Sequence, residues 1–433
     1  MRRLFMLICL LALFGASGGL PSHANEGVIR VNINEPLGEI SPYVYGANYG
    51  PWALLPVDLW GMAETSGITF FRFPGGEWGD RNDLSTNHID SYIKFAQRMN
   101  AEPTISVRLR GGTPEKAAEM VRYVNLEHNY GVRYWSIGNE PNLYPDYDAE
   151  THAKDWRAFA LAMRAVDPNI LLIGPDISQY PPSLEDYHAP LRDWVRTFLK
   201  ANADLVEVVS IHRYPFPKSM NAAPTTIAEL RASAAEWEFI IPDLRQVVRE
   251  SAGRDMPIAV MEVNSHWNKP TGGAASPDSY FNAIWWADVL ARLIRQRVDM
   301  VAFWLLASYG ENGPYGLFDR YKERPTFYVY PLYKRLGKQL VHAESENTAL
   351  TVVAALTEDE QLTLMIVNPD DVPHTARLEV EGIGSCHVVG AWRLDPELKA
   401  EPIRISETAQ TFDLPAYSAT LYLIEPRCRP LRF

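Results

Sequence analysis

Short apolar runs rich in β-branched and aromatic residues alternate with amphipathic segments along most of the chain. Eight such runs occupy residues 43–50, 68–76, 103–109, 133–142, 170–178, 206–215, 257–265 and 299–308. Strands that are apolar throughout and separated by helices are typical of parallel sheets with helices outside. The pattern predicts a (β/α)8 TIM barrel, with an open doubly wound sheet as the competitor. Polar residues at nearly every strand's carboxyl end favour the barrel.

Two of the intervening segments show how the helices are expected to begin and end. Residues 113–131 open on Thr113-Pro114 and close at Gly131, a cap followed by a stop. Residues 276–297 open on Ser276-Pro277 and carry an apolar stripe at helical spacing. Trp285 and Trp286 fall on this second helix, and we expect them in the core.

The pattern of hydrophobic and polar residues changes after residue 336. Short alternating segments separated by turn residues occupy 348–356, 361–369, 376–382, 386–394, 410–416 and 418–426. They predict a small antiparallel β-sandwich over residues 337–433, behind a barrel over 38–336. Residues 25–37 hold one alternating strand that we expect to join the sandwich. Trp392 is its one evident stacking residue, so an accessory packed on the barrel is favoured over an independent binding module.

The first residues resemble an export signal. Arg2 and Arg3 precede an apolar stretch over residues 4–16, and Ser22-His23-Ala24 is a small-x-small cleavage pattern. These features predict a signal peptide over residues 1–24, cut after Ala24, and a secreted or periplasmic protein. No later apolar run has the length of a membrane span.

Composition excludes some partners. The chain carries 41 Lys and Arg against 53 Asp and Glu, a net charge of −12, which argues against nucleic acid and anionic membranes. A hydrophobic content of 47% with 12 tryptophans indicates a large packed core. After processing, Cys386 and Cys428 remain, and they form either one disulfide or two buried thiols. No pattern indicates an oligomeric state.

Functional side chains of a barrel project from the carboxyl ends of its strands. Glu140 and Glu262 end the fourth and seventh strands, which face each other across the barrel mouth. Paired carboxylic acids are what glycosidic bond cleavage needs, one as acid and one as nucleophile or base. The other polar or aromatic residues at strand ends are Asn48, Arg72, Arg108, Arg110, Asn139, Asp176, His212, Arg213, Tyr214, Asn264 and Trp304.

The neighbours of the two glutamates suggest a division of labour. Arg72, His212 and Tyr214 would bias Glu262 toward the carboxylate, whereas the apolar approach to Glu140 would raise its pKa. Asp176 is expected to be structural, and His212 is either functional or simply a hydrogen-bonded strand-end histidine. His266 has no second or third ligand at metal spacing, so neither a metal nor another cofactor is expected.

Four of these motifs carry a family resemblance. RFPGG on the second strand, WSIGNEPN on the fourth, HRYP on the sixth and MEVNS on the seventh resemble clan A of the retaining glycoside hydrolases. HRYP and EVNS are most similar to family 79, which contains heparanases and β-glucuronidases, and families 39 and 51 share parts of the motifs.

The resemblance implies roles for individual residues. Glu140 would be the acid/base and Glu262 the nucleophile, while Arg72 and Tyr214 would order the nucleophile. Asn139 would bind the sugar 2-hydroxyl. The remaining candidates for substrate binding are Trp304, as the floor of the pocket, with Asn48 and His212.

We therefore expect a retaining glycosidase that works by double displacement, with its two carboxyl groups about 5–5.5 Å apart. The activity that we favour is that of a β-glucuronidase or heparanase-like enzyme. The alternatives are β-xylosidase, arabinofuranosidase or endo-glycanase activity. The same residues would also perform transglycosylation. The alternative of another class is a non-catalytic carbohydrate-binding protein.

Overall fold

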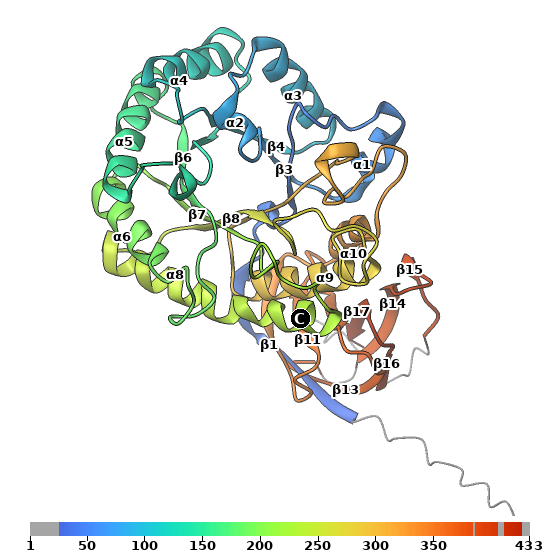
Figure 1. The fold of residues 1–433 in the computed structure, drawn as a ribbon. Helices are drawn as coiled ribbons and strands as arrows, with labels where there is room; N and C mark the ends of the chain where they lie inside the picture. Colours follow the sequence, from blue (N-terminus) through green and yellow to red (C-terminus); the bar gives the residue numbers. More distant parts are fainter. Residues whose placement is uncertain (1–25, 384–385, 406–410, 427–433) are drawn as a thin grey trace, which may run out of the picture.

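Eight parallel strands close into a barrel in the computed structural model, which describes residues 26–383, 386–405 and 411–426. Each predicted run contributes one strand, and the strands follow one another around the ring in chain order (Figure 1). They are β2 (Gly46–Asn48), β3 (Phe70–Phe73), β4 (Glu102–Val107), β5 (Tyr134–Ile137), β6 (Leu171–Ile177), β7 (Val208–Arg213), β8 (Ile258–Val263) and β9 (Met300–Phe303). The predicted barrel is confirmed, and the open sheet is excluded.

Helices surround the ring. They are α1 (Trp60–Ser66), α2 (Trp78–Arg81), α3 (Thr86–Arg98), α4 (Pro114–Val121), α5 (Ala149–Val166), α6 (Leu191–Asn202), α7 (Ile227–Ser233), α8 (Trp237–Ala252), α9 (Tyr280–Arg295) and α10 (Val329–Tyr333). The short α2 lies inside this outer layer, near the loop after β5 (Figure 1). Helix α4 is capped by the Thr113 hydroxyl, which accepts from the Lys116 N–H at 3.3 Å, as predicted. It continues as a π-helix over Arg122–Glu127.

The predicted start of α9 is wrong by three residues. The helix begins at Tyr280, and its cap is Ser279, whose hydroxyl accepts from the Asn282 N–H at 3.1 Å. Ser276 instead donates to the carbonyl of Gly273 at 2.7 Å and so belongs to a preceding turn. Trp285 and Trp286 are buried as expected.

A nine-stranded, mostly antiparallel sheet packs beside the barrel, in the order β15-β14-β17-β12-β11-β10-β1-β13-β16. The strands are β1 (Glu26–Glu39), β10 (Gln339–Ser345), β11 (Thr351–Leu356), β12 (Leu362–Asn368), β13 (His374–Glu381), β14 (Cys386–Leu394), β15 (Lys399–Pro402), β16 (Thr411–Leu414) and β17 (Ser418–Pro426). Strand β1 pairs with β10 antiparallel and with β13 parallel. Phe412 of β16 stacks on Tyr422 of β17 at 4.1 Å between ring centroids, although these strands lie far apart in the sheet order. The sheet therefore curls onto itself as a β-sandwich with its own core.

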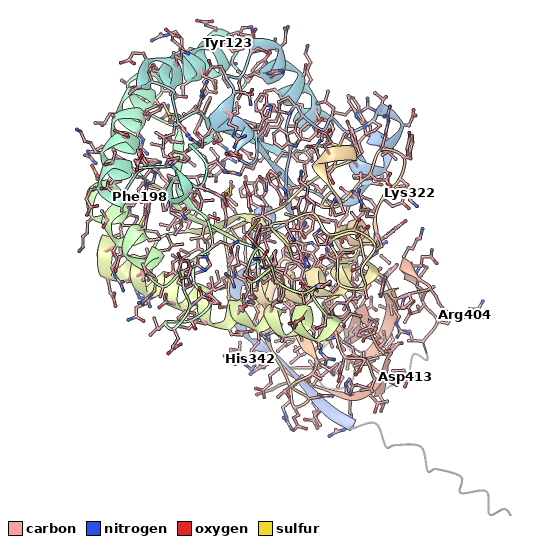
Figure 2. All side chains as sticks on the ribbon, viewed as in Figure 1. Tyr123, Phe198, Lys322, His342, Arg404 and Asp413 are labelled. Carbon is pink, nitrogen blue, oxygen red and sulfur yellow. The ribbon has the colours of Figure 1, made fainter. Side chains whose placement is uncertain are left out.

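The two parts meet along α9, which packs between the barrel and strands β11 and β12. The Thr351 hydroxyl donates to the Asp288 carboxylate at 2.7 Å and accepts from Arg292 at 3.0 Å. Because both faces of α9 are covered, nearly all of its side chains are buried. Side chains fill both the barrel and the β-sandwich (Figure 2). Phe198 marks helix α6 of the outer layer, and His342 and Asp413 mark strands β10 and β16 of the sheet.

Inside the barrel, a small apolar cluster includes Phe70, Ile173, Met261 and Ala302. Arg72 follows Phe70 by two residues on the same face of β3, so the polar site begins one layer closer to the strands' carboxyl ends. Within the described ranges, no helix is both long and apolar enough to cross a bilayer. The predicted signal peptide and Cys428 lie outside the described residues.

Candidate active site

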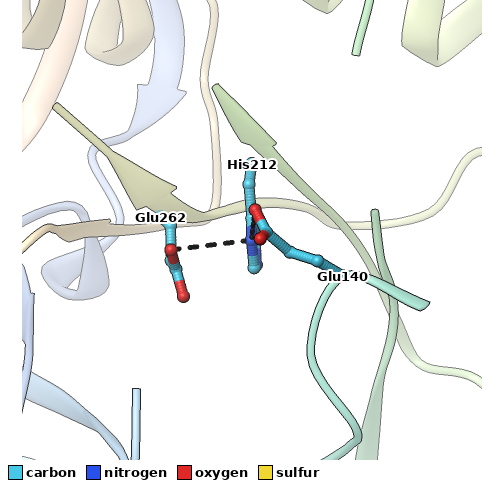
Figure 3. A group of neighbouring side chains, drawn as sticks. All are labelled: Glu140, His212 and Glu262. Carbon is cyan, nitrogen blue, oxygen red and sulfur yellow. Dashed lines mark hydrogen bonds and ion pairs between the residues drawn. The ribbon is translucent and has the colours of Figure 1, made fainter. Parts of the chain in front are cut away.

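The two glutamates singled out from the sequence lie next to each other at the barrel mouth (Figure 3). One carboxylate oxygen of Glu140 and one of Glu262 are no more than 4.8 Å apart. Both line a cavity of about 840 Å³ built from the loops that follow the strands. Carboxyl groups this close match the spacing of retaining glycosidases, since inverting enzymes hold theirs about 6.5–9.5 Å apart.

A β-bulge directs Glu262 into the cavity. Ile211 of β7 lies opposite Val260 of β8, but the next residue, His212, lies opposite Glu262, so β8 carries one extra residue at Met261. A bulge of this kind reorients the side chain that follows it. Met261 therefore packs in the interior cluster while its neighbour Glu262 faces the mouth.

Three donors hold the Glu262 carboxylate. Its Oε1 accepts from Arg72 Nη1 at 2.7 Å and from the Gly76 N–H at 3.0 Å, and its Oε2 accepts from the Tyr214 hydroxyl at 2.7 Å. Gly76 has a φ of +67°, and a Cβ there would lie 2.3 Å from the Trp304 ring. Glycine is therefore required for the backbone to reach the carboxylate. These contacts hold the Glu262 carboxylate in one orientation toward the cavity, which a nucleophile needs.

Glu140 enters from a strained backbone position at the end of β5. Its φ and ψ are +48° and +53°, a left-handed conformation that is uncommon for a residue with a side chain. The Glu140 N–H donates to the carbonyl of Asp176 at 2.9 Å, which secures this turn. The side chain remains 18% exposed to the cavity.

His212 is fully buried between the acidic groups of the site. Its Nδ1 lies 3.1 Å from Glu140 Oε1 and 3.8 Å from Glu262 Oε2, and its Nε2 lies 3.8 Å from Asp176 Oδ1. Burial alone would lower the pKa of His212. The charge of Glu262, the nearby Asp176 carboxylate and the hydrogen bond to Glu140 outweigh it and raise the pKa to about 9. The imidazole is therefore protonated at neutral pH.

The expected direction for Glu140 is wrong. Burial raises its pKa, but the hydrogen bond and charge of His212 outweigh that effect, so the pKa lies below the ordinary value. Glu140 and His212 thus titrate as a unit that holds one proton between them. The sequence showed an apolar approach to Glu140 and did not reveal the imidazolium beside it.

Asp176 belongs to the same charge network. It is almost fully buried, and its Oδ2 accepts from Arg72 Nη2 at 3.4 Å. Burial opposes ionisation of Asp176, yet the charges of Arg72 and His212 lower its pKa. Asp176 supports the charged groups and does not line the cavity, so its position agrees with the structural role expected for it.

Asp80 was not found from the sequence, although it positions Asn139. Its carboxylate accepts from the N–H groups of Leu109, Arg110 and Asn139 at 3.1, 3.2 and 2.8 Å, and from the Tyr144 hydroxyl. Asn139 Oδ1 in turn accepts from Arg72 Nη2 at 3.0 Å. An aspartate in a short helix after β3 has no pattern that marks it, because its partners come from two later loops.

The other predicted residues divide into those that face the cavity and those behind it. Trp304 lines the cavity and stacks on Trp52, with ring centroids 6.1 Å apart. Asn48 is fully buried; its amide donates to the carbonyls of Met261 and Ala302 and accepts from Arg72. Asn48 and His212 therefore support other side chains, and the direct sugar contact expected of them does not fit their burial.

Three more strand-end residues act away from the cavity. Arg108 points outward to Asp83 at 3.1 Å, and Arg110 lies over the Tyr144 ring. Asn264 is buried against the backbone of Trp304.

Glu140, His212 and Glu262 each offer one ligand atom within the same 4.8 Å, which is a spacing that a metal ion could use. The chemistry of this group favours a proton instead. The pKa of His212 is raised, so its ring holds a proton where a metal ligand would need a free nitrogen lone pair. Glu262 is already paired with the Arg72 guanidinium. His266 is bonded to Ser265 and Thr225 through its two ring nitrogens.

No protein-family model matches the chain. It is similar to an intracellular exo-α-(1→5)-L-arabinofuranosidase of Streptomyces lividans, with 27% identity over 230 residues, which make up 43% of this chain and 33% of that protein. The chain spans about half the length of the fungal α-L-arabinofuranosidases that it also matches.

Solved structures share the whole architecture. A family 51 arabinofuranosidase from Xanthomonas axonopodis superposes with a TM-score of 0.72 at 15% identity, covering 92% of this chain and 100% of the other. A family 44 xyloglucanase from Paenibacillus polymyxa has a TM-score of 0.71 at 16% identity, covering 92% and 99%. The barrel with its β-sandwich is thus the fold found in family 51. These relatives give no support to family 79, the leading resemblance, and do support family 51, one of the two families that share parts of the motifs.

Proposed function

We propose that the chain is a retaining glycoside hydrolase and that α-L-arabinofuranosides are its substrates. The observation that carries the reaction class is the pair of carboxylates no more than 4.8 Å apart, one held by three donors and the other bonded to an imidazolium. The similarity to arabinofuranosidases carries the choice of sugar.

In the first step, Glu262 attacks the anomeric carbon while Glu140 protonates the departing glycosidic oxygen. A covalent glycosyl ester forms on Glu262, and the leaving group departs as an alcohol. The proton comes from the unit formed by Glu140 and His212. As Glu262 loses its charge on forming the ester, its attraction for the His212 proton falls, which favours transfer through Glu140.

In the second step, Glu140 removes a proton from water, which attacks the same carbon and releases Glu262. Two inversions give net retention. An acceptor sugar in place of water would give transglycosylation by the same residues.

Two further residues are placed to bind the sugar. The amide oxygen of Asn139 accepts a hydrogen bond from Arg72. Its Nδ2 makes no hydrogen bond to the described residues, so this N–H group is available to donate to a sugar hydroxyl. Trp304 offers a ring to the apolar face of a sugar beside Glu262. Arg72, Tyr214 and Gly76 act on the nucleophile.

The test is a panel of 4-nitrophenyl glycosides that carry α-L-arabinofuranose, β-xylose, β-glucose and β-glucuronate. We expect the arabinofuranoside to be cleaved with the highest kcat/KM and NMR to show retention in the first product formed. Inversion, or no cleavage of any member by folded protein, would overturn the reaction class. A preference for another sugar would overturn only the choice of substrate.

Endo-action on a β-glucan or xylan is the second candidate, because the xyloglucanase fold matches this chain as fully as the arabinofuranosidase fold. Viscometry of xyloglucan and arabinoxylan separates the two. A rapid fall in viscosity with little release of monosaccharide would favour the endo-acting enzyme.

A further inference from the structure

The cavity is also lined by an aromatic ring and two lysines. Trp267 follows β8, and Lys218 and Lys269 come from the loops after β7 and β8; all three line the same cavity as Glu140 and Glu262. Trp267 is 39% exposed to solvent. A cavity of about 840 Å³ lies in the upper part of the range of ligand pockets, so it has room for more than one sugar unit.

The two loops are bonded to each other, which fixes Trp267. The Phe216 N–H donates to the carbonyl of Ser265 at 3.0 Å, and the Trp267 N–H donates to the carbonyl of Phe216 at 2.7 Å. The indole N–H donates to the carbonyl of Pro217 at 2.8 Å, one residue before Lys218. The ring is therefore held in place without a ligand. Binding a sugar to its open face would cost little side-chain entropy.

The charges around Trp267 are unbalanced. Glu236 is shared by Lys218, at 3.0 Å, and by Arg213, which also lines the cavity. Lys269 donates to the backbone carbonyl of Glu311, and it forms no ion pair with a carboxylate of the described residues.

Besides the two catalytic glutamates, the acidic residues that line the cavity are Asp186 and Glu77. Asp186 bonds His188 at 2.8 Å, and Glu77 bonds Arg81 at 2.5 Å. Only Glu77 is paired with a cation of its own. Arg213, Lys218 and Lys269 therefore carry three positive charges against the two negative charges of Glu236 and Asp186. One positive charge is left in excess at the end of the cavity lined by the loops after β7 and β8, on a chain whose net charge is −12.

We propose that this end of the cavity binds a uronate unit of the substrate, one or more sugars away from the bond that is cleaved. Trp267 stacks on the sugar ring, and Lys218 and Lys269 attract its carboxylate. A neutral sugar needs the aromatic ring alone, whereas two ammonium groups with one shared counterion suit an anion. The inference rests on the proposed glycosidase function and adds that the substrate is an acidic polysaccharide.

The test compares a glucuronate-bearing arabinogalactan with the same polymer after its carboxyl groups are reduced to alcohols. Wild-type protein should cleave the acidic polymer with a kcat/KM about tenfold higher, the size expected of partly exposed ion pairs. Lys218→Gln with Lys269→Gln should bring the ratio of the two rates to about one. Equal rates for the two polymers with wild-type protein, or an unchanged ratio in the double variant, would overturn the proposal.

The matched control is Lys94→Gln with Lys154→Gln, which removes the same charge from exposed positions on α3 and α5. It should keep the tenfold ratio. A loss of the ratio in this control would assign the effect to net charge and overturn the site.

Binding separates this proposal from the proposed function. Titration calorimetry of the Glu262→Gln variant with trigalacturonate and with xylotriose needs no turnover. Tighter binding of trigalacturonate that is lost in the Lys218 and Lys269 background supports the acidic subsite even if the aryl glycoside panel fails. Equal binding of both oligosaccharides rejects the subsite even if the panel succeeds.

Discussion

Replacing His212 with glutamine tests the proton that Glu140 and His212 share. In the wild-type site this pair keeps its proton until about pH 9, the pKa of His212. In the variant the proton must reside on Glu140 alone, whose ordinary pKa is 4.5 and is raised by burial. The basic limb of kcat/KM should therefore move toward acid by about two units or more, which is a loss of about tenfold or more at pH 8 relative to the variant's own optimum.

The same substitution changes stability in a direction that follows from the raised pKa. A folded pKa of about 9 against an ordinary value of 6.5 contributes about 3 kcal/mol, fully present below pH 6.5 and lost as the pH rises through 9. Urea unfolding at pH 6 and at pH 9.5 should show the advantage of the wild-type protein over the variant shrinking by that amount.

The assay is a pH–rate profile from pH 4 to 10 with the preferred aryl glycoside. His266→Gln is the matched control, since burial lowers the pKa of His266 to about 4 and this ring stays neutral above that pH. Its basic limb should match that of the wild-type protein. An unmoved basic limb in the His212 variant would refute the shared proton.

Other perturbations have equally definite outcomes. Glu140→Gln should lower kcat by about 10²- to 10⁴-fold and Glu262→Gln by more, because no covalent intermediate can form. With azide, Glu140→Ala should give a glycosyl azide of retained configuration and Glu262→Ala one of inverted configuration; the same product from both would contradict the assigned roles. Arg72→Met should destabilise the fold by about 3–5 kcal/mol, because it leaves buried carboxylates unpaired, and urea unfolding within 1 kcal/mol of wild type would contradict that. Expressed with an export pathway, the mature protein should begin at Asn25 by mass spectrometry, and retention of Met1 would contradict a cleaved signal.

Much of the fold follows from local periodicity. All eight barrel strands were predicted, because strands that are buried on both faces leave continuous apolar runs. The β-sandwich was predicted from its alternating segments, which did not include strands β10 and β15. The start of α9 was misplaced because Ser276-Pro277 has the residues of a helix cap, yet Ser276 serves a turn. Local sequence does not distinguish these two uses of serine.

The site was predicted less completely than the fold. Glu140, Glu262, Arg72 and Tyr214 were found because strand order alone brings them to one end of the barrel. Asp80 was missed because its partners lie in later loops.

By itself, the sequence determined the eight-stranded architecture, the end of the barrel that bears the chemistry and the two carboxylates there. These follow from the alternation of strands and helices and from residues that sit at strand ends. Only the tertiary structure decided the charge state of the site. His212 and Glu140 lie 72 residues apart in the chain and 3.1 Å apart in space, and a pKa depends on distances across the barrel that no local pattern records. The closed barrel placed an imidazolium beside the acid, and it enclosed Asn48 and His212 behind the side chains that face the cavity.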